Sequence, residues 1–166
     1  ILLCKGERVI MEEVKKIENT AEESDTLEQY IVVKIGNEQY GINIQYIDNI
    51  VRSQKITRVP KTQKYYKGVI NLRGEIIPVM SIRLKLGLED DVFTDKTRII
   101  IVKVENATIG VIVDQVKEVV TLDEENTEKI TRTANDDAAA GYISGIGKSK
   151  GELISLLDIV GVVVEN

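Results

Sequence analysis

The chain has 166 residues and a formal net charge of −5, and its 43% hydrophobic content can bury one good core or two small cores that share an interface. It contains no histidine, which excludes imidazole base catalysis, Ser–His triads and His-ligated zinc within the chain. The acidic balance gives nucleic acid no electrostatic attraction, and no apolar run approaches the roughly 20 residues of a membrane span. Ile and Val dominate while aromatic residues make up 4%, so we expect a soluble, mainly β protein without direct membrane insertion.

Residues 1–26 read as a leader followed by a disordered arm. The chain begins without Met, and we interpret residues 1–10, which precede Met11, as translated leader from a misassigned start. Residues 12–25 are acidic and bear lysines, a composition typical of a solvated, disordered or frayed helical arm. The stretch lacks the apolar region and cleavage site of a signal peptide, and Cys4, as the only cysteine, suits a reducing cytoplasm.

The region after this arm is expected to begin with a hairpin. Gly36-Asn37 lies between two runs rich in β-branched residues, which is a sound turn signal. Residues 44–51 place apolar side chains at helical spacing and predict a helix. Residues 61–67 read as one helical turn that stops at Gly68.

A second hairpin and a short helix follow. Val69–Leu72 and Glu75–Val79 flank Arg73-Gly74, where the glycine can take the positive φ that a tight turn demands. The Arg73 guanidinium is therefore expected near a hairpin tip. Ser81 has the side chain of a helix N-cap, and Gly87 fits the end of the helix that would start there.

The chain contains an internal repeat. Residues 30–41 align with residues 99–110 at a shift of 69, whereas the Gly68 region aligns with the Gly145 region at a shift of 77. The second copy therefore has eight extra residues, which we place in the acidic, Ala-rich loop 123–140. The repeat predicts another hairpin turn at Glu105-Asn106, while periodicity leaves residues 111–120 open between strand and turn.

Each copy is expected to curl into a small closed barrel, because about five short strands are too few to bury a flat sheet. The first barrel would span about residues 27–96 and the second about 97–166, with some exchange of strands or helices left open. Two barrels packed side by side would leave a groove between them, and such a groove suits a helix or another barrel as a partner.

Four motifs give the chain a resemblance to a known family. They are Tyr40-Gly-Ile-Asn-Ile44, Tyr66-Lys-Gly-Val-Ile-Asn-Leu-Arg-Gly74, Ile77-Pro-Val79 and Gly110-Val-Ile-Val-Asp114. At this spacing they closely resemble the bacterial chemotaxis coupling proteins of the CheW family, over about residues 27–166. The resemblance implies two SH3-like five-stranded barrels with short helices, no catalysis and no cofactor or metal. It also implies an adaptor that links the cytoplasmic tips of methyl-accepting chemoreceptors to the regulatory domain of the histidine kinase CheA.

Two other functions compete with this adaptor. The same fold could be the regulatory module of a larger kinase or of a coupling-receiver fusion protein. A carboxylate-dependent enzyme or a nucleic-acid-binding barrel is disfavoured, because histidine is absent and a single Phe offers little for base stacking.

Arg73 is the first candidate for partner contact, because an Arg at a hairpin tip offers a planar fork of donors. The alternative is a solvated turn Arg that contributes little. The other partner-binding candidates are Gly68, Asn71, Ile47, Asn49, Val116 and Val119. Of these, the glycine and Asn71 are expected mainly to shape the hairpin, and the three apolar residues can serve either the core or an interface. The family often has acidic residues where Asn49 and Ser81 stand here, so the resemblance does not carry over an ion pair between position 49 and Arg73.

Overall fold

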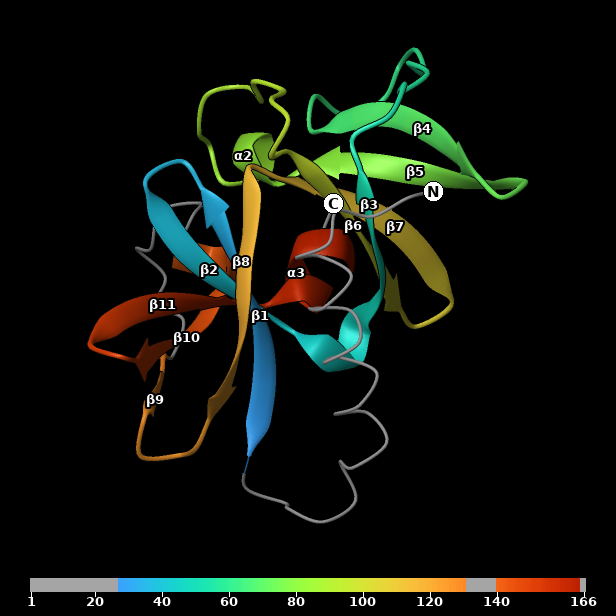
Figure 1. Ribbon diagram of the computed structural model, residues 1–166. Coiled ribbons are helices and arrows are strands. Elements are labelled where there is room, and N and C mark those ends of the chain that lie inside the picture. Colours follow the sequence, from blue (N-terminus) through green and yellow to red (C-terminus); the bar gives the residue numbers. More distant parts are fainter. Residues whose placement is uncertain (1–26, 131–139, 165–166) are drawn as a thin grey trace.

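The structure is a computed structural model that describes residues 27–130 and 140–164. The leader and arm expected at residues 1–26, and residues 131–139 of the expected insertion loop, lie outside the described residues. The described chain is mainly β and forms two sheets (Figure 1). This confirms the predicted fold class.

The strands of the first copy are β1 (Glu28–Ile35), β2 (Glu38–Asn43), β3 (Ile47–Arg52), β4 (Tyr66–Leu72) and β5 (Glu75–Ser81). Those of the second copy are β6 (Arg98–Val104), β7 (Ala107–Val113), β8 (Gln115–Leu122), β9 (Thr127–Lys129), β10 (Ile143–Ser149) and β11 (Glu152–Leu157). The helical elements are η2 (Ile44–Tyr46), α2 (Ile82–Lys85), η3 (Ala140–Tyr142) and α3 (Ile159–Val164). None of the helices in the described ranges is long and apolar enough to cross a membrane.

The two sheets have equivalent strand orders, but each takes strands from both copies. The six-stranded sheet has the order β8-β1-β2-β11-β10-β9, and the five-stranded sheet has the order β3-β6-β7-β5-β4. The first hairpin of each copy thus joins the sheet of the other copy, through the parallel pairs β2–β11 and β5–β7. This corrects the contiguous barrels expected at about 27–96 and 97–166, and shows the strand exchange that the sequence left open.

The crossing from β2 to β3 explains this exchange and corrects the helix expected over residues 44–51. Asn43 ends β2 and caps the 3-10 turn η2, because its Oδ1 accepts a hydrogen bond of 3.1 Å from the Gln45 N–H. The chain then enters β3, where Ile47 and Ile50 pair with β6 of the other copy. The apolar spacing therefore belongs to a 3-10 turn and a strand, in which β-branched residues pack well.

Each sheet is closed into a barrel by the segment that follows one of its end strands. This segment pairs with the second hairpin of the same sheet. In the five-stranded sheet Thr57, beyond β3, pairs with Val69 of β4. In the six-stranded sheet β9, beyond β8, pairs with β10. The helical turn expected at residues 61–67 is wrong, since β4 already begins at Tyr66 and Gly68 lies inside that strand.

The core has three parts, of which the largest lies between the sheets. Smaller clusters fill the barrels, represented by Ile70 and Ile99 in one and by Val32 and Leu156 in the other. The central cluster takes buried side chains such as Ile42 from both sheets and from the helices that follow them. The groove expected between the barrels is therefore occupied by apolar side chains, since burying each contributes about 1.5–3 kcal/mol.

Candidate partner-binding surface

The tip of the β4–β5 hairpin is a fixed turn that presents Arg73 to solvent. Arg73 and Gly74 both have positive φ, at 53° and 83°, which matches a two-residue turn between twisted strands. Asn71 steadies this turn, because its Oδ1 accepts a hydrogen bond of 2.9 Å from the Gly74 N–H. Among the described residues no side chain pairs with the Arg73 guanidinium, so its donors face outward.

Gly68 is placed where the barrel closes. It is buried, its φ is 141°, and a Cβ added to it would lie 2.1 Å from the Thr57 carbonyl oxygen. Thr57 and Val69 exchange two backbone hydrogen bonds of 2.8 Å at this point, so the two backbones need a residue without a side chain. Gly145, its counterpart in the repeat, has the same close approach, with an added Cβ 2.7 Å from the Glu128 carbonyl oxygen.

Ile47 and Asn49 lie on β3, on either side of a bulge in its pairing with β6. Ile47 is 6% exposed and belongs to the central core, so its side chain packs inside the molecule. Asn49 is half-buried, and its Oδ1 accepts a hydrogen bond of 2.9 Å from the Ile50 N–H. Both side chains thus make contacts within the fold.

Val116 and Val119 lie on β8, the end strand of the six-stranded sheet. They pair with Val33 and Ile31 of β1 and pack, half-buried, against the central core. The structure places β8 and the tip of the β4–β5 hairpin on different parts of the molecule (Figure 1). The residues predicted from the sequence therefore do not form one continuous site.

An ion pair that sequence reasoning missed joins the two sheets. Asp114, between β7 and β8, accepts hydrogen bonds of 3.0 and 2.5 Å from Nε and Nη2 of Arg83 on α2. It also accepts one of 2.8 Å from the Gly36 N–H in the β1–β2 turn. Burial opposes its ionisation, but these donors outweigh burial and hold the pKa of Asp114 below its ordinary value. One signal in the sequence pointed to Asp114: it is the last residue of Gly110-Val-Ile-Val-Asp114, one of the four motifs that resemble the family.

Ser81 caps α2 as predicted, and a nearby carboxylate supports it. Its Oγ accepts a hydrogen bond of 3.2 Å from the Leu84 N–H, and its hydroxyl donates to the Asp91 carboxylate. Burial raises the pKa of Asp91, although the Ser81 hydroxyl opposes this shift. The cap of α2 thus combines a serine with a carboxylate from the following loop.

These features define a class of protein: a mainly β double barrel, built from two copies of one unit that exchange their first hairpins and share a central core. Such a duplicated fold presents two equivalent sheets in a fixed mutual arrangement.

The comparisons with known proteins agree with this class. The CheW-like domain family matches residues 29–165. The chain is 35% identical over 136 residues to chemotaxis protein CheW of Bacillus subtilis, which covers 82% of this chain and 86% of that protein. It is 33% identical over 138 residues to chemotaxis protein CheW of Helicobacter pylori, covering 83% of this chain and 82% of that protein.

A solved structure is similar as well. The scaffolding protein TtCheW from Thermoanaerobacter tengcongensis matches with a TM-score of 0.75 and 30% sequence identity, covering 84% of this chain and 94% of that chain. The chain belongs to the CheW family, and the resemblance predicted from its motifs is confirmed.

Proposed function

We propose that this protein is a chemotaxis scaffold that couples the cytoplasmic tips of chemoreceptors to the regulatory domain of the histidine kinase CheA, without catalysing a reaction. Family membership over residues 29–165 carries the proposal. Relatives that match most of the chain are named chemotaxis protein CheW, and the solved relative is named a scaffolding protein.

The geometry supports such a role in two ways. The Asn71 hydrogen bond fixes the backbone turn that carries Arg73 at an exposed tip, so little ordering of the turn would be needed for a partner to use it. The central core joins the two sheets, so partners bound to different sheets would be held in a defined mutual geometry. A receptor that changes its own conformational equilibrium could then bias that of the kinase through differential contacts.

The test is a titration of the purified chain with the CheA regulatory domain and, separately, with the cytoplasmic tip fragment of a chemoreceptor from the same cell. We expect each to bind, and we expect the kinase domain to capture the receptor fragment only when the chain is present. Absence of binding to both partners would overturn the proposed function.

A further inference from the structure

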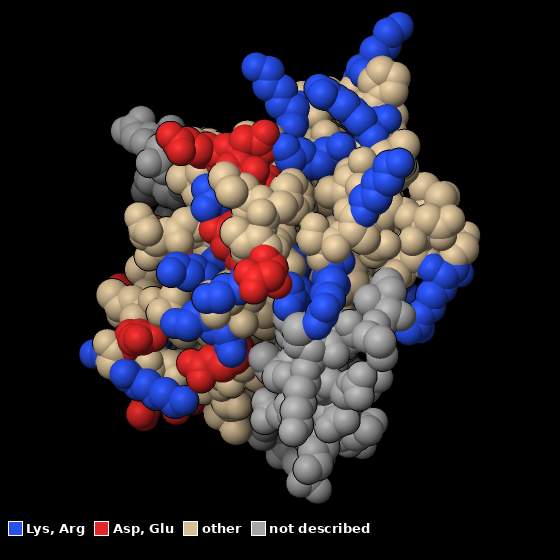
Figure 2. All heavy atoms as spheres, turned by 45° about the horizontal axis from the view of Figure 1, so that its top comes forward, with Lys and Arg blue, Asp and Glu red and all other residues tan. Residues whose placement is uncertain are grey.

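The connection from β3 to β4 concentrates positive charge in an otherwise acidic chain. Between residues 52 and 67 every third residue is basic and none is acidic; the cations are Arg52, Lys55, Arg58, Lys61, Lys64 and Lys67. Figure 2 shows Lys and Arg side chains gathered at the upper end of the molecule, where Figure 1 places this connection. The chain as a whole carries −5, so the charge is segregated on the surface.

Several of these cations have no acidic neighbour in the part of the chain that the structure describes. Lys67 pairs with Asp90 at 2.5 Å. Arg58, Lys61 and Lys64 are exposed, and no carboxylate within residues 27–130 and 140–164 pairs with any of them. Like charges held close together repel, and an acidic partner would relieve that repulsion.

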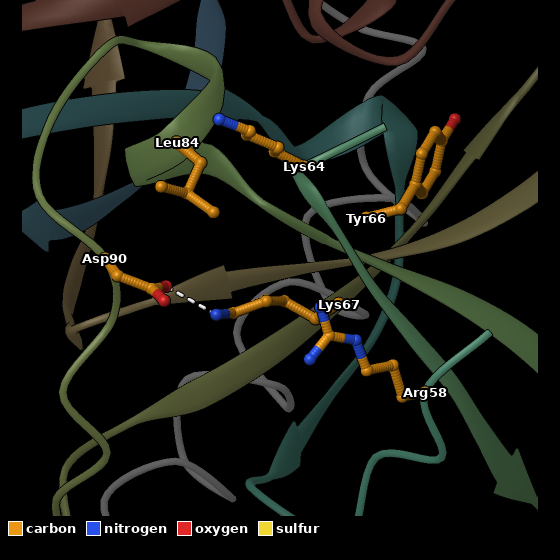
Figure 3. A pocket seen from close by; sticks show the side chains of 6 residues that line it. All are labelled: Arg58, Lys64, Tyr66, Lys67, Leu84 and Asp90. Carbon is orange, nitrogen blue, oxygen red and sulfur yellow. Dashed lines mark hydrogen bonds and ion pairs between the residues drawn. The ribbon is translucent and has the colours of Figure 1, made fainter. Parts of the chain in front are cut away.

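Three of the cations line one pocket of about 420 Å³, together with Tyr66, Leu84 and Asp90. Figure 3 shows the Arg58 guanidinium beside the Lys67 side chain, whose nitrogen reaches Asp90, while Lys64 extends from the opposite side of the pocket. One carboxylate faces three cations, so the pocket keeps an excess of positive charge. A concave site of this size and charge is suited to acidic groups.

An apolar pocket lies next to the basic one, since Tyr66 lines both. It has a volume of about 300 Å³, and Val59, Val69 and Pro78 contribute to its walls. Val59 is held on the connecting loop, because its carbonyl accepts a hydrogen bond of 3.1 Å from the Thr62 hydroxyl. The surface therefore combines an apolar hollow with a basic rim.

We propose that these two adjoining pockets, here called the basic-rim surface, dock an acidic peptide segment of a partner protein. An apolar side chain of that segment would fill the pocket at Val59, and carboxylates beside it would meet Arg58 and Lys64. Charge complementarity and the apolar hollow together favour a peptide, because a nucleic-acid backbone offers charge without a protruding apolar side chain. The inference goes beyond the proposed function, since it depends on the chemistry of the segment and not on which protein carries it.

The test uses the full chain and a short fluorescein-labelled synthetic peptide in which glutamates flank a single leucine, followed by fluorescence anisotropy. One comparison peptide has Gln for each Glu, and another has Ser for the Leu. We expect the first peptide to bind most tightly and its affinity to fall from about 0.1 M to about 1 M salt, as the screening length shortens from about 10 Å to about 3 Å. Vesicles containing phosphatidylserine and a DNA duplex serve as the other anionic probes.

Charge reversal locates the site. The double variant Arg58→Glu/Lys64→Glu is expected to bind the Glu–Leu peptide about tenfold more weakly, because exposed charge pairs are lost and repulsion replaces them. Lys129→Glu/Lys148→Glu, which reverses two exposed lysines on the six-stranded sheet, is the matched control and should bind as the parent does. The proposal would be overturned if the Gln peptide bound as tightly as the Glu peptide, or if the control variant lost as much peptide affinity as the charge-reversed variant. Binding of vesicles or DNA without binding of the peptide would also overturn it. Circular dichroism of both variants shows that each is folded.

Discussion

Arg83 and Asp114 form the ion pair that ties α2 to the junction between β7 and β8, with nitrogen–oxygen distances of 3.0 and 2.5 Å. Their side chains are 19% and 25% exposed, so water screens the pair only in part. Removing one partner would leave the other charge largely desolvated, which is why this contact is a sensitive point of the fold.

We expect Asp114→Asn to lower the free energy of unfolding at neutral pH by about 1 to 3 kcal/mol, because the Arg83 charge loses its partner. The folded-state pKa of Asp114 is depressed, so its contribution is present above the unfolded pKa of about 3.9 and is lost as pH falls through the folded value. Urea unfolding at several pH values measures this. The difference in free energy of unfolding between the parent and the variant should shrink below about pH 4. A difference that does not change with pH would contradict the assignment.

Asp91→Asn should not lower the free energy of unfolding at neutral pH, in contrast to Asp114→Asn. The folded-state pKa of Asp91 is raised, mainly by burial, so its protonated form is stabilising and that contribution is lost as pH rises above the unfolded value of about 3.9. Among the described residues its Oδ1 is buried without a hydrogen-bond partner. At neutral pH we expect the variant to unfold at the same or higher urea concentration than the parent. A loss as large as that of Asp114→Asn would show that the Asp91 charge is needed.

Gly68→Ala should destabilise the protein by more than about 3 kcal/mol, because its Cβ would clash with the Thr57 carbonyl oxygen at 2.1 Å. Gly74→Ala is the control, since that glycine also has positive φ but no atom beyond its two chain neighbours lies within 4 Å of an added Cβ. Its cost should be about 1 to 2 kcal/mol, from the backbone conformation alone. Equal midpoints in urea unfolding would mean that the barrel closes in another way.

Arg73→Ala should weaken binding of the receptor tip about tenfold while leaving the fold intact, because an exposed fork of donors is removed. Lys150→Ala is the matched control: Lys150 holds the equivalent turn position in the repeat, with φ of 52° against 53° for Arg73. Binding is followed by surface plasmon resonance and the fold by thermal unfolding. Undiminished receptor binding, or a lowered melting temperature, would contradict the role given to Arg73.

A fragment of residues 27–96 should not fold as a monomer, although it contains a whole copy of the repeat. Its β1–β2 hairpin pairs with β8 and β11, which the fragment lacks. Mixing it with a fragment of residues 97–164 should restore the β circular-dichroism signal of the full chain, and self-association of either fragment through its free hairpin is the alternative product. A folded, monomeric fragment would refute the hairpin exchange.

Much of the candidate site could be predicted from the sequence, because it depends on local backbone and side-chain preferences. The Arg73-Gly74 turn, the Ser81 cap and the end at Gly87 were predictable because each depends on a few neighbouring residues and their backbone preferences. The interior place of Ile47 was not, because an apolar side chain has the same pattern whether it faces a core or a partner. The basic-rim surface also required the fold, since Asp90 neutralises Lys67 only after β5 and α2 bring the two together.

The residue pattern alone establishes that a β unit occurs twice, where its hairpins turn, and to which family the chain is similar. The sheet that each first hairpin enters depends instead on pairing between residues far apart in the chain, which the fold reveals. The two copies offer equivalent strand edges, so local hydrogen bonding and apolar pattern favour both arrangements alike. The short η2 crossing sends the chain directly from one sheet to the other, and one central core is buried when each hairpin pairs with the opposite copy.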